Sequence, residues 1–191
     1  MTVKRFYWQQ EIVAKFPGVV LNIGSNEDPA RLKQTFGHRI LNCDFEAFDS
    51  ELKRPNQVDI IFDAVKDRWP FPDNYANLIV MGDMLEHLMV PDIEAILAKA
   101  YRVGTHLAIT VPRDERIANQ PNINNTSNPY MYHQTIVTEE LLRKLLQKTN
   151  WNVIDWQTVD YQFVPEGYLV LCWRKPTLQS LGLMGGPTWI T

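Results

Sequence analysis

The chain has 191 residues, of which 45% are hydrophobic and 21% are charged, and its formal net charge is −3. This size and composition predict one globular domain with a full core, and they exclude a chain that is disordered throughout. The acidic balance argues against a dedicated nucleic-acid-binding protein, which carries a basic surface. No apolar run approaches the ~20 residues of a membrane-spanning helix, so no membrane partner is expected.

The first 17 residues predict a helix rather than a secretion signal. Polar residues interrupt the apolar positions of this segment, so the continuous apolar stretch of a signal peptide is missing. The helical pattern covers Phe6–Lys15, and its aromatic residues are interpreted as core packing or as a cover over a ligand.

The two cysteines, Cys43 and Cys172, both lie in apolar runs. We expect buried free thiols rather than a disulfide, which fits a reducing compartment and a cytoplasmic location. The sequence has no Cys/His cluster with zinc spacing, so no metal is expected.

Short apolar runs alternate with helical patterns up to residue 175. The runs are rich in Val, Ile and Leu, which is typical of strands that are covered on both faces. They are Val19–Ile23, Arg39–Cys43, Ile60–Phe62, Leu78–Met81, His106–Val111, Asn152–Thr158 and Tyr168–Trp173. The helical patterns are Phe6–Lys15, Pro29–Thr35, Met84–Leu88, Ile93–Tyr101 and Thr138–Lys148. This order predicts a three-layer, doubly wound α/β sheet in a single domain of residues 1–175, whose last two strands form a hairpin, followed by a tail of residues 176–191.

The loop after the first strand is a candidate ligand site. Gly24 directly follows the strand, and a glycine there permits close approach of the backbone to a ligand. Glu27 and Asp28 would repel a pyrophosphate at the start of the next helix, so the loop disfavours NAD. A tight turn without a ligand is the alternative interpretation of Gly24.

Asp44 ends the second strand, 20 positions after Gly24. In doubly wound nucleotide-binding folds, an acidic residue ~20 positions after the first loop binds the ribose hydroxyls. A carboxylate suits this task because it can accept hydrogen bonds from both hydroxyls of a vicinal diol. A solvated loop residue is the alternative for Asp44.

The most informative stretch covers residues 59 to 88 and reads DIIFDAVKDRWPFPDNYANLIVMGDMLEHL. It resembles the corresponding stretch of class I S-adenosylmethionine (SAM) dependent methyltransferases, of the small-molecule type with a Leu-Glu-His helix start. The resemblance covers roughly residues 18 to 174. It implies a Rossmann-like fold with a seven-stranded, mostly parallel sheet whose last strand is antiparallel. It also implies SAM as the cofactor and S-adenosylhomocysteine as its product.

The resemblance also implies roles for residues at the strand ends. Asp63 would bind the adenine amino group, Ala64 would offer its backbone amide to the ring, and Gly82 with Asp83 would flank the methionine part. The implied cofactor-binding residues are Asn22, Gly24, Ser25, Asp44, Phe45, Asp63, Ala64, Met81, Gly82 and Asp83. The chain departs from the family motif in two places, because Asn22 replaces an aspartate and residues 25–28 lack the later glycines.

Residues 113–137 form the longest segment without a regular pattern, which favours a functional lid or a disordered segment over an idle connection. His133 lies in this segment, ahead of a helix start that is similar to the Thr-x-Glu-Glu-Leu pattern of the family, and the resemblance places it on the substrate side. It is the candidate catalytic base, and a loop histidine that anchors backbone is the alternative. Glu86 and His87 are interpreted as a helix-start pair that binds neighbouring backbone.

The resemblance therefore implies a SAM-dependent methyltransferase, and we expect it to act on a small-molecule acceptor. The alternative is a non-catalytic subunit with the same fold, favoured by the glycine-poor loop and by the apolar tail, through which a homodimer or a partner complex would form. An NAD-dependent oxidoreductase is disfavoured by the acidic loop.

Overall fold

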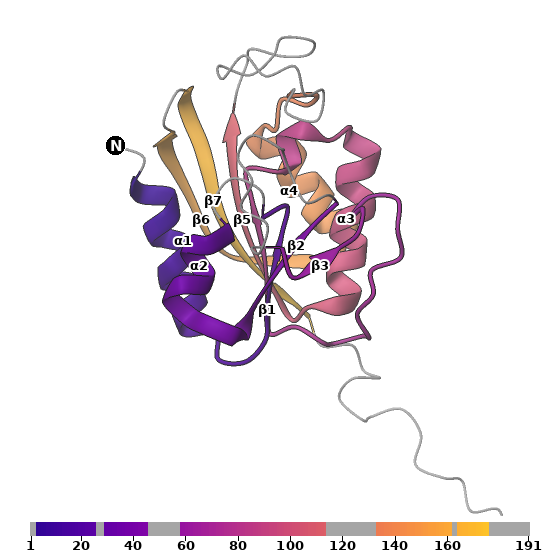
Figure 1. Ribbon diagram of the computed structural model, residues 1–191. Helices are drawn as coiled ribbons and strands as arrows, with labels where there is room; N and C mark the ends of the chain where they lie inside the picture. The colour runs from indigo at the N-terminus through magenta and orange to yellow at the C-terminus, as the bar shows by residue number, and fades with distance from the viewer. Residues whose placement is uncertain (1–2, 26–28, 46–57, 114–132, 162–163, 176–191) are drawn as a thin grey trace, which may run out of the picture.

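The computed structural model describes residues 3–25, 29–45, 58–113, 133–161 and 164–175 (Figure 1). Its strands form one seven-stranded sheet in the order β3-β2-β1-β4-β5-β7-β6. Neighbouring strands are parallel, except that β7 runs antiparallel to both β5 and β6. The predicted α/β fold with an antiparallel last strand is confirmed. The strands are β1 (Val20–Ile23), β2 (Ile40–Asp44), β3 (Ile60–Ile61), β4 (Leu78–Gly82), β5 (His106–Arg113), β6 (Trp151–Tyr161) and β7 (Val164–Arg174).

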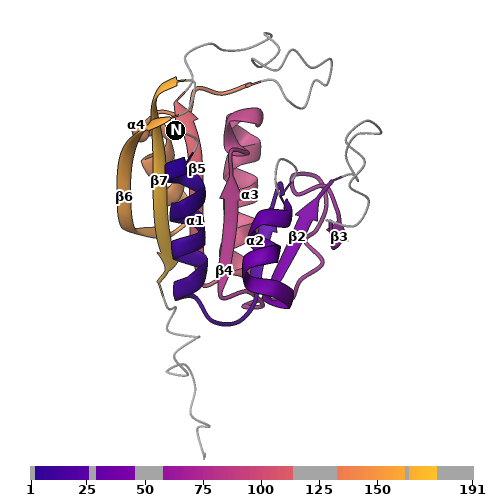
Figure 2. The ribbon, with the colours of Figure 1, turned by 60° about the vertical axis from the view of Figure 1, so that its left-hand side comes forward.

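Helices cover both faces of the sheet, as Figures 1 and 2 show. On one face lie α1 (Val3–Lys15) and α2 (Pro29–Phe36), and on the other lie α3 (Val90–Val103) and α4 (Glu139–Lys148). Two short 3₁₀ turns, η1 (Gly37–Arg39) and η2 (Leu85–His87), complete the described elements. Within these ranges, no helix combines the length and the apolar character that crossing a bilayer requires.

The core consists of two layers because successive strand residues point to opposite faces of a sheet. Leu78 and Val80 of β4 pack in the layer beneath α1, whereas Ile79 and Met81 pack in the layer beneath α3 and α4. All four side chains are buried. The continuous apolar runs therefore reflect burial on both faces, as predicted for the central strands.

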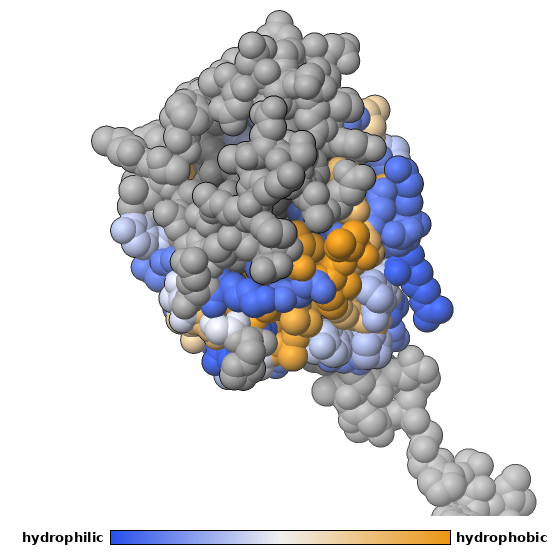
Figure 3. Space-filling model, in the orientation of Figure 1, coloured by the Kyte–Doolittle hydropathy of each residue, from blue (hydrophilic) through white to orange (hydrophobic). Residues whose placement is uncertain are grey.

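The edge strand β3 departs from this pattern. It has two residues instead of the predicted three, and Ile61 is 60% exposed. Figure 3 shows a hydrophobic area on the face where β3 lies in Figure 1. An edge strand lacks a neighbour on one side, so an apolar run does not ensure that both of its faces are covered.

The predicted start of α4 is confirmed. The Thr138 hydroxyl accepts a hydrogen bond from the Leu141 amide at 3.2 Å, and acidic residues occupy the first turn. This N-cap satisfies one of the amides that have no partner within the helix. The helix buries Leu142, Leu145 and Leu146 against the sheet.

The predicted helix at Met84–Leu88 is wrong in type. The segment forms only the 3₁₀ turn η2, Leu88 is extended, and α3 begins separately at Val90. Pro91 explains the break, because a proline has no amide hydrogen and its ring would clash with the carbonyl four residues earlier in a continuous helix. At the first turn of α3 the same proline is well tolerated.

The predicted free thiols are confirmed, because Cys43 and Cys172 are both buried and unpaired with each other. Burial raises the pKa of each thiol to about 12. The prediction of a docking tail concerns residues 176–191, and most of the predicted lid concerns residues 114–132; both lie outside the described residues.

Candidate functional site

The predicted site residues lie at one edge of the sheet. Since β1 to β5 pair in parallel, their carboxyl ends meet there. From β1 the chain continues to β2 and β3 on one side, and β4 and β5 lie on the other side. Such a switch point is where open α/β sheets bind their ligands.

Gly24 turns the chain at the end of β1. Its φ of 68° is in the left-handed region that favours glycine, and its amide donates to the Cys43 carbonyl at 2.9 Å. A Cβ added to Gly24 would lie 2.9 Å from the Met84 sulfur. The hydroxyl of Ser25 is buried and has no hydrogen-bond partner among the residues that the structure describes. At the switch point, the backbone of Gly24 is therefore closely approached by the Met84 side chain, and the buried Ser25 hydroxyl lies next to it in the chain.

Asn22 lies one residue before the end of β1 and points to β2. Its side-chain amide donates to the Asn42 side-chain oxygen at 3.0 Å, and both residues are buried. A neutral amide pair satisfies this interior position without burying a charge, which explains an asparagine in place of the family's aspartate. The structure thus shows Asn22 linking β1 to β2.

Asp44 lies beside Gly24, because Ile23 of β1 is in register with Cys43 of β2. Its carboxylate is buried and accepts a hydrogen bond from the Phe45 amide at 2.8 Å. The structure therefore has a buried carboxylate next to the glycine turn.

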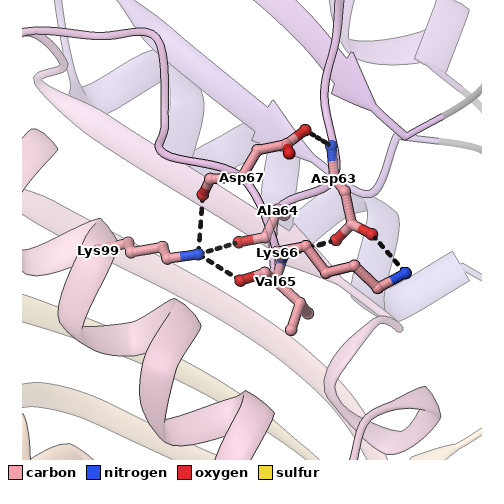
Figure 4. A network of polar contacts seen from close by, with 6 residues as sticks. All are labelled: Asp63, Ala64, Val65, Lys66, Asp67 and Lys99. Carbon is pink, nitrogen blue, oxygen red and sulfur yellow. Dashed lines mark hydrogen bonds and ion pairs between the residues drawn. The ribbon is translucent and has the colours of Figure 1, made fainter.

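Asp63 caps a tight turn after β3 (Figure 4). One carboxylate oxygen accepts hydrogen bonds from the amides of Val65 and Lys66, each at 2.9 Å, and the other lies 3.2 Å from the Lys66 ammonium. Burial acts to raise the pKa of the Asp63 carboxyl, but these hydrogen bonds outweigh it and the pKa is lowered. The carboxylate is therefore ionised at neutral pH and fixes the turn that carries Ala64.

Lys99 of α3 supports this turn from the other side (Figure 4). Its ammonium donates to the carbonyls of Ala64 at 3.2 Å, Val65, and Asp67 at 2.9 Å. The Trp69 indole also donates to the Ala64 carbonyl, at 2.9 Å. The sequence did not single out Lys99, because α3 carries other charged residues and the carbonyls that Lys99 binds lie more than 30 positions away.

Asp83 adopts φ 49°, which is uncommon for a residue other than glycine. Its amide donates to the Thr110 carbonyl at 2.8 Å, and the Thr110 hydroxyl donates to its carboxylate at 3.3 Å. The Gln9 side-chain amide in turn donates to the Thr110 hydroxyl at 3.0 Å. Non-glycine residues in this conformation cluster at functional sites. Gln9 and Thr110 were not found from the sequence, because their partners are remote in the chain.

The backbone of Gly82 packs against the Gln9 side chain. A Cβ added to Gly82 would lie 2.6 Å from the Gln9 side-chain nitrogen. The neighbouring Trp8 is buried in the core, so α1 both packs on the sheet and extends a side chain to the site edge.

Glu86, His87 and His133 form a cluster just beyond Asp83. The Glu86 carbonyl accepts the amides of Gln134 at 2.7 Å and Thr135 at 3.2 Å, so the segment that starts at His133 lies against η2. The rings of His87 and His133 have centroids 4.9 Å apart at an interplanar angle of 71°. One ligand atom from each of the three residues lies within 4.8 Å of the others, a grouping that could hold a metal ion.

A scan of protein-family models finds no match to this sequence, and a search of curated proteins finds none either. Solved structures do match. A SAM-dependent methyltransferase from Archaeoglobus fulgidus has a TM-score of 0.62 and 16% identity, with 88% of this chain and 92% of that chain covered.

Two further structures that match were solved with a bound ligand. The 1,6-didemethyltoxoflavin-N1-methyltransferase of Burkholderia thailandensis, with 1,6-didemethyltoxoflavin and S-adenosylhomocysteine, has a TM-score of 0.63 and 15% identity over 90% of this chain and 77% of that one. The magnesium protoporphyrin IX methyltransferase of Synechocystis PCC 6803, with SAM, has a TM-score of 0.56 and 14% identity over 89% and 76%. At such low identity the likeness concerns the fold: this chain has the Rossmann-like fold of class I SAM-dependent methyltransferases.

Proposed function

We propose that this protein is a SAM-dependent methyltransferase that acts on a small-molecule acceptor. The observation that carries the proposal is the convergence of Gly24, Asp44 and Asp83 at the switch point of a methyltransferase fold. A glycine turn, a buried carboxylate beside it and a constrained residue after the adjacent strand are the features that a nucleoside cofactor needs there.

The residues at this edge fit SAM. The Asp44 carboxylate would accept hydrogen bonds from the ribose hydroxyls, and Phe45 follows it. The turn of Asp63 and Ala64 would face the adenine ring. Gly82 and Asp83, after the buried Met81, would face the methionine part. Acidic groups around this edge favour the sulfonium and ammonium cations of SAM over the anionic pyrophosphate of NAD.

Bound SAM would supply a methyl group that is already activated on a sulfonium. The protein then needs mainly to hold the acceptor in line with that methyl group, because orientation alone accounts for a large share of such accelerations. His133 lies beside η2, which follows Asp83 closely in the chain, and we assign it to the acceptor side. There its imidazole would orient the acceptor or remove its proton.

Three observations favour a small-molecule acceptor. The net charge of −3 does not suit a nucleic-acid substrate. Two of the matching structures belong to methyltransferases named for small molecules, 1,6-didemethyltoxoflavin and magnesium protoporphyrin IX. The described chain also has one sheet with its covering helices and no second sheet that would form a separate substrate domain.

Buried free cysteines support a cytoplasmic location.

Isothermal titration calorimetry of the purified chain tests the proposal. SAM and S-adenosylhomocysteine should bind with a stoichiometry of one, and NAD should bind much more weakly. Absence of binding by both adenosyl ligands at millimolar concentration would reject the enzyme and favour the non-catalytic subunit. Tighter binding of NAD would favour the oxidoreductase instead. Once SAM binding is shown, an acceptor screen that detects S-adenosylhomocysteine tests catalysis.

A further inference from the structure

The cluster of Glu86, His87 and His133 has the composition of a transition-metal site. It offers two imidazole nitrogens and one carboxylate oxygen, and these atoms lie within 4.8 Å of one another. Two histidines with one carboxylate form the protein ligands of several catalytic zinc sites and of the facial triad of iron enzymes. The two elements that carry the ligands, η2 and the segment before α4, are joined by the backbone hydrogen bonds of the Glu86 carbonyl.

The burial of Glu86 is compatible with a metal site at this cluster. Only 2% of the Glu86 residue surface is exposed, so its carboxylate lies in the interior, where an ion would be shielded from solvent. The His87 Nε2 atom is 3.8 Å from the Glu86 Oε1 atom, which is longer than a hydrogen bond. The His87 imidazole and the Glu86 carboxylate are therefore close neighbours that could both coordinate one ion.

The distance also suits a shared ion. Two ligands that each lie about 2.1 Å from one ion, at an angle of about 90–110°, are about 3.0–3.4 Å apart. The 3.8 Å separation would therefore need to shorten by about 0.4–0.8 Å, which rotations of the two side chains can supply. The ligand atoms of the three residues lie within 4.8 Å of one another, so the His133 ring, which is only partly buried, would move by up to about 1.4–1.8 Å.

We propose that Glu86, His87 and His133 bind one divalent transition-metal ion, with Zn²⁺ as the best fit to two nitrogens and one oxygen. Mg²⁺ and Ca²⁺ fit poorly because they prefer oxygen ligands. Three protein ligands leave at least one coordination position open, as in catalytic rather than structural zinc sites. Metal binding itself does not depend on the proposed methyl transfer.

A role for the ion does rest on the proposed function. The cluster follows Asp83 at the acceptor side of the site, so an ion there would polarise an acceptor hydroxyl group. A ligating nitrogen of His133 could not accept a proton at the same time, so His133 would then serve as a ligand rather than as the base.

The test uses the untagged 191-residue chain after treatment with a chelator. It is titrated with Zn²⁺, Mg²⁺ and Co²⁺ as separate probes, and visible absorption of Co²⁺ reports the coordination. We expect one Zn²⁺ or Co²⁺ per chain, a Co²⁺ spectrum of low coordination number, and no comparable binding of Mg²⁺. Absence of stoichiometric Zn²⁺ and Co²⁺ binding would overturn the proposal.

Variants locate the site. His133→Ala and Glu86→Gln should each weaken Co²⁺ binding at least about tenfold, roughly the minimum known for groups that only support a ligand. His106→Gln is the matched control, because His106 starts β5 at the opposite edge of the sheet. Circular dichroism checks folding, and His133→Ala keeps the test valid if Glu86→Gln does not fold. Equal Co²⁺ affinity in the wild type and in folded His133→Ala would overturn the assignment.

SAM calorimetry on the same metal-free and metal-loaded samples separates the two proposals. A chain that binds Zn²⁺ but not SAM supports the metal site and rejects the methyltransferase. A chain that binds SAM but no transition metal rejects the metal site alone.

Discussion

The side-chain amide of Gln9 lies 3.0 Å from the hydroxyl of Thr110, although 101 positions separate the two residues. The contact joins α1 to β5, and Thr110 in turn donates to the Asp83 carboxylate. A residue of the first helix thereby helps to fix the strained residue at the centre of the candidate site.

Because of this contact, the effect of Gly82→Ala on the free energy of unfolding should depend on whether Gln9 is present. In Gly82→Ala the new Cβ would displace the Gln9 amide, and the lost hydrogen bond should lower the free energy of unfolding by about 1 kcal/mol. In a Gln9→Ala background the same substitution should have almost no effect. Urea unfolding of the four proteins without ligand measures this coupling. Equal effects of Gly82→Ala in both backgrounds would contradict the contact.

Asp44 is expected to contribute strongly to SAM affinity. Hydrogen bonds to a charged group contribute about 1.5–3 kcal/mol, so Asp44→Ala should weaken binding about ten- to a hundredfold. The control is Asp73→Ala. Asp73 precedes β4 in the chain, and its exposed carboxylate pairs with Arg102 of α3. Calorimetry with SAM measures both variants, and an unchanged affinity of folded Asp44→Ala would show that the ribose assignment is wrong.

Lys99→Met should loosen the turn that carries Asp63 and Ala64. The variant keeps the apolar stem but loses the charged group that donates to three carbonyls, so the free energy of unfolding should fall by about 1.5–3 kcal/mol. Lys148→Met is the matched control, because the exposed ion pair of Lys148 with Glu94 should contribute less than about 1 kcal/mol.

The turn also contributes to the proposed adenine site, so Lys99→Met should weaken SAM binding while Lys148→Met should not. Chemical unfolding and calorimetry on the same samples give the two readouts. If both lysine variants lose the same stability and both keep full SAM affinity, Lys99 has no special role in this turn.

Cys43 and Cys172 should be inert in the folded protein. Burial raises the pKa of both thiols from 9.0 to about 12, and thiolates are the reactive form. At about pH 8, below the pKa of an ordinary thiol, an aromatic disulfide reagent should therefore label neither cysteine in the native state and both in denaturant. Rapid labelling of either thiol in the native protein would contradict its burial.

The same shifts give a pH dependence of stability. Because the unfolded chain releases these thiol protons at lower pH than the folded one, the stability is full below pH 9.0 and falls as the pH rises towards 12. The double variant with alanine at both positions should show a smaller fall over that window in urea unfolding. Comparison with this variant separates the thiols from other groups that titrate there.

The sequence by itself determined the layered fold and the edge of the sheet that carries the candidate site. Continuous apolar runs require cover on both faces, and their alternation with helical patterns leaves a doubly wound sheet as the solution. Local signals also sufficed for the cap at Thr138, and the offset between Gly24 and Asp44 placed the carboxylate beside the turn. Each of these depends on residues that are near in sequence or on a strand order that is common to the fold.

Only the tertiary structure decided which remote side chains meet at that edge. Lys99 reaches a carbonyl 35 positions away, Gln9 reaches Thr110, and His133 joins Glu86 and His87 across a long segment of chain. Periodicity and spacing describe a residue's own helix or strand, and they carry no information on the partner that another element brings to it. For the same reason the grouping of Glu86, His87 and His133 could not be predicted, because His133 becomes a neighbour of the other two only when the segment before α4 lies against η2.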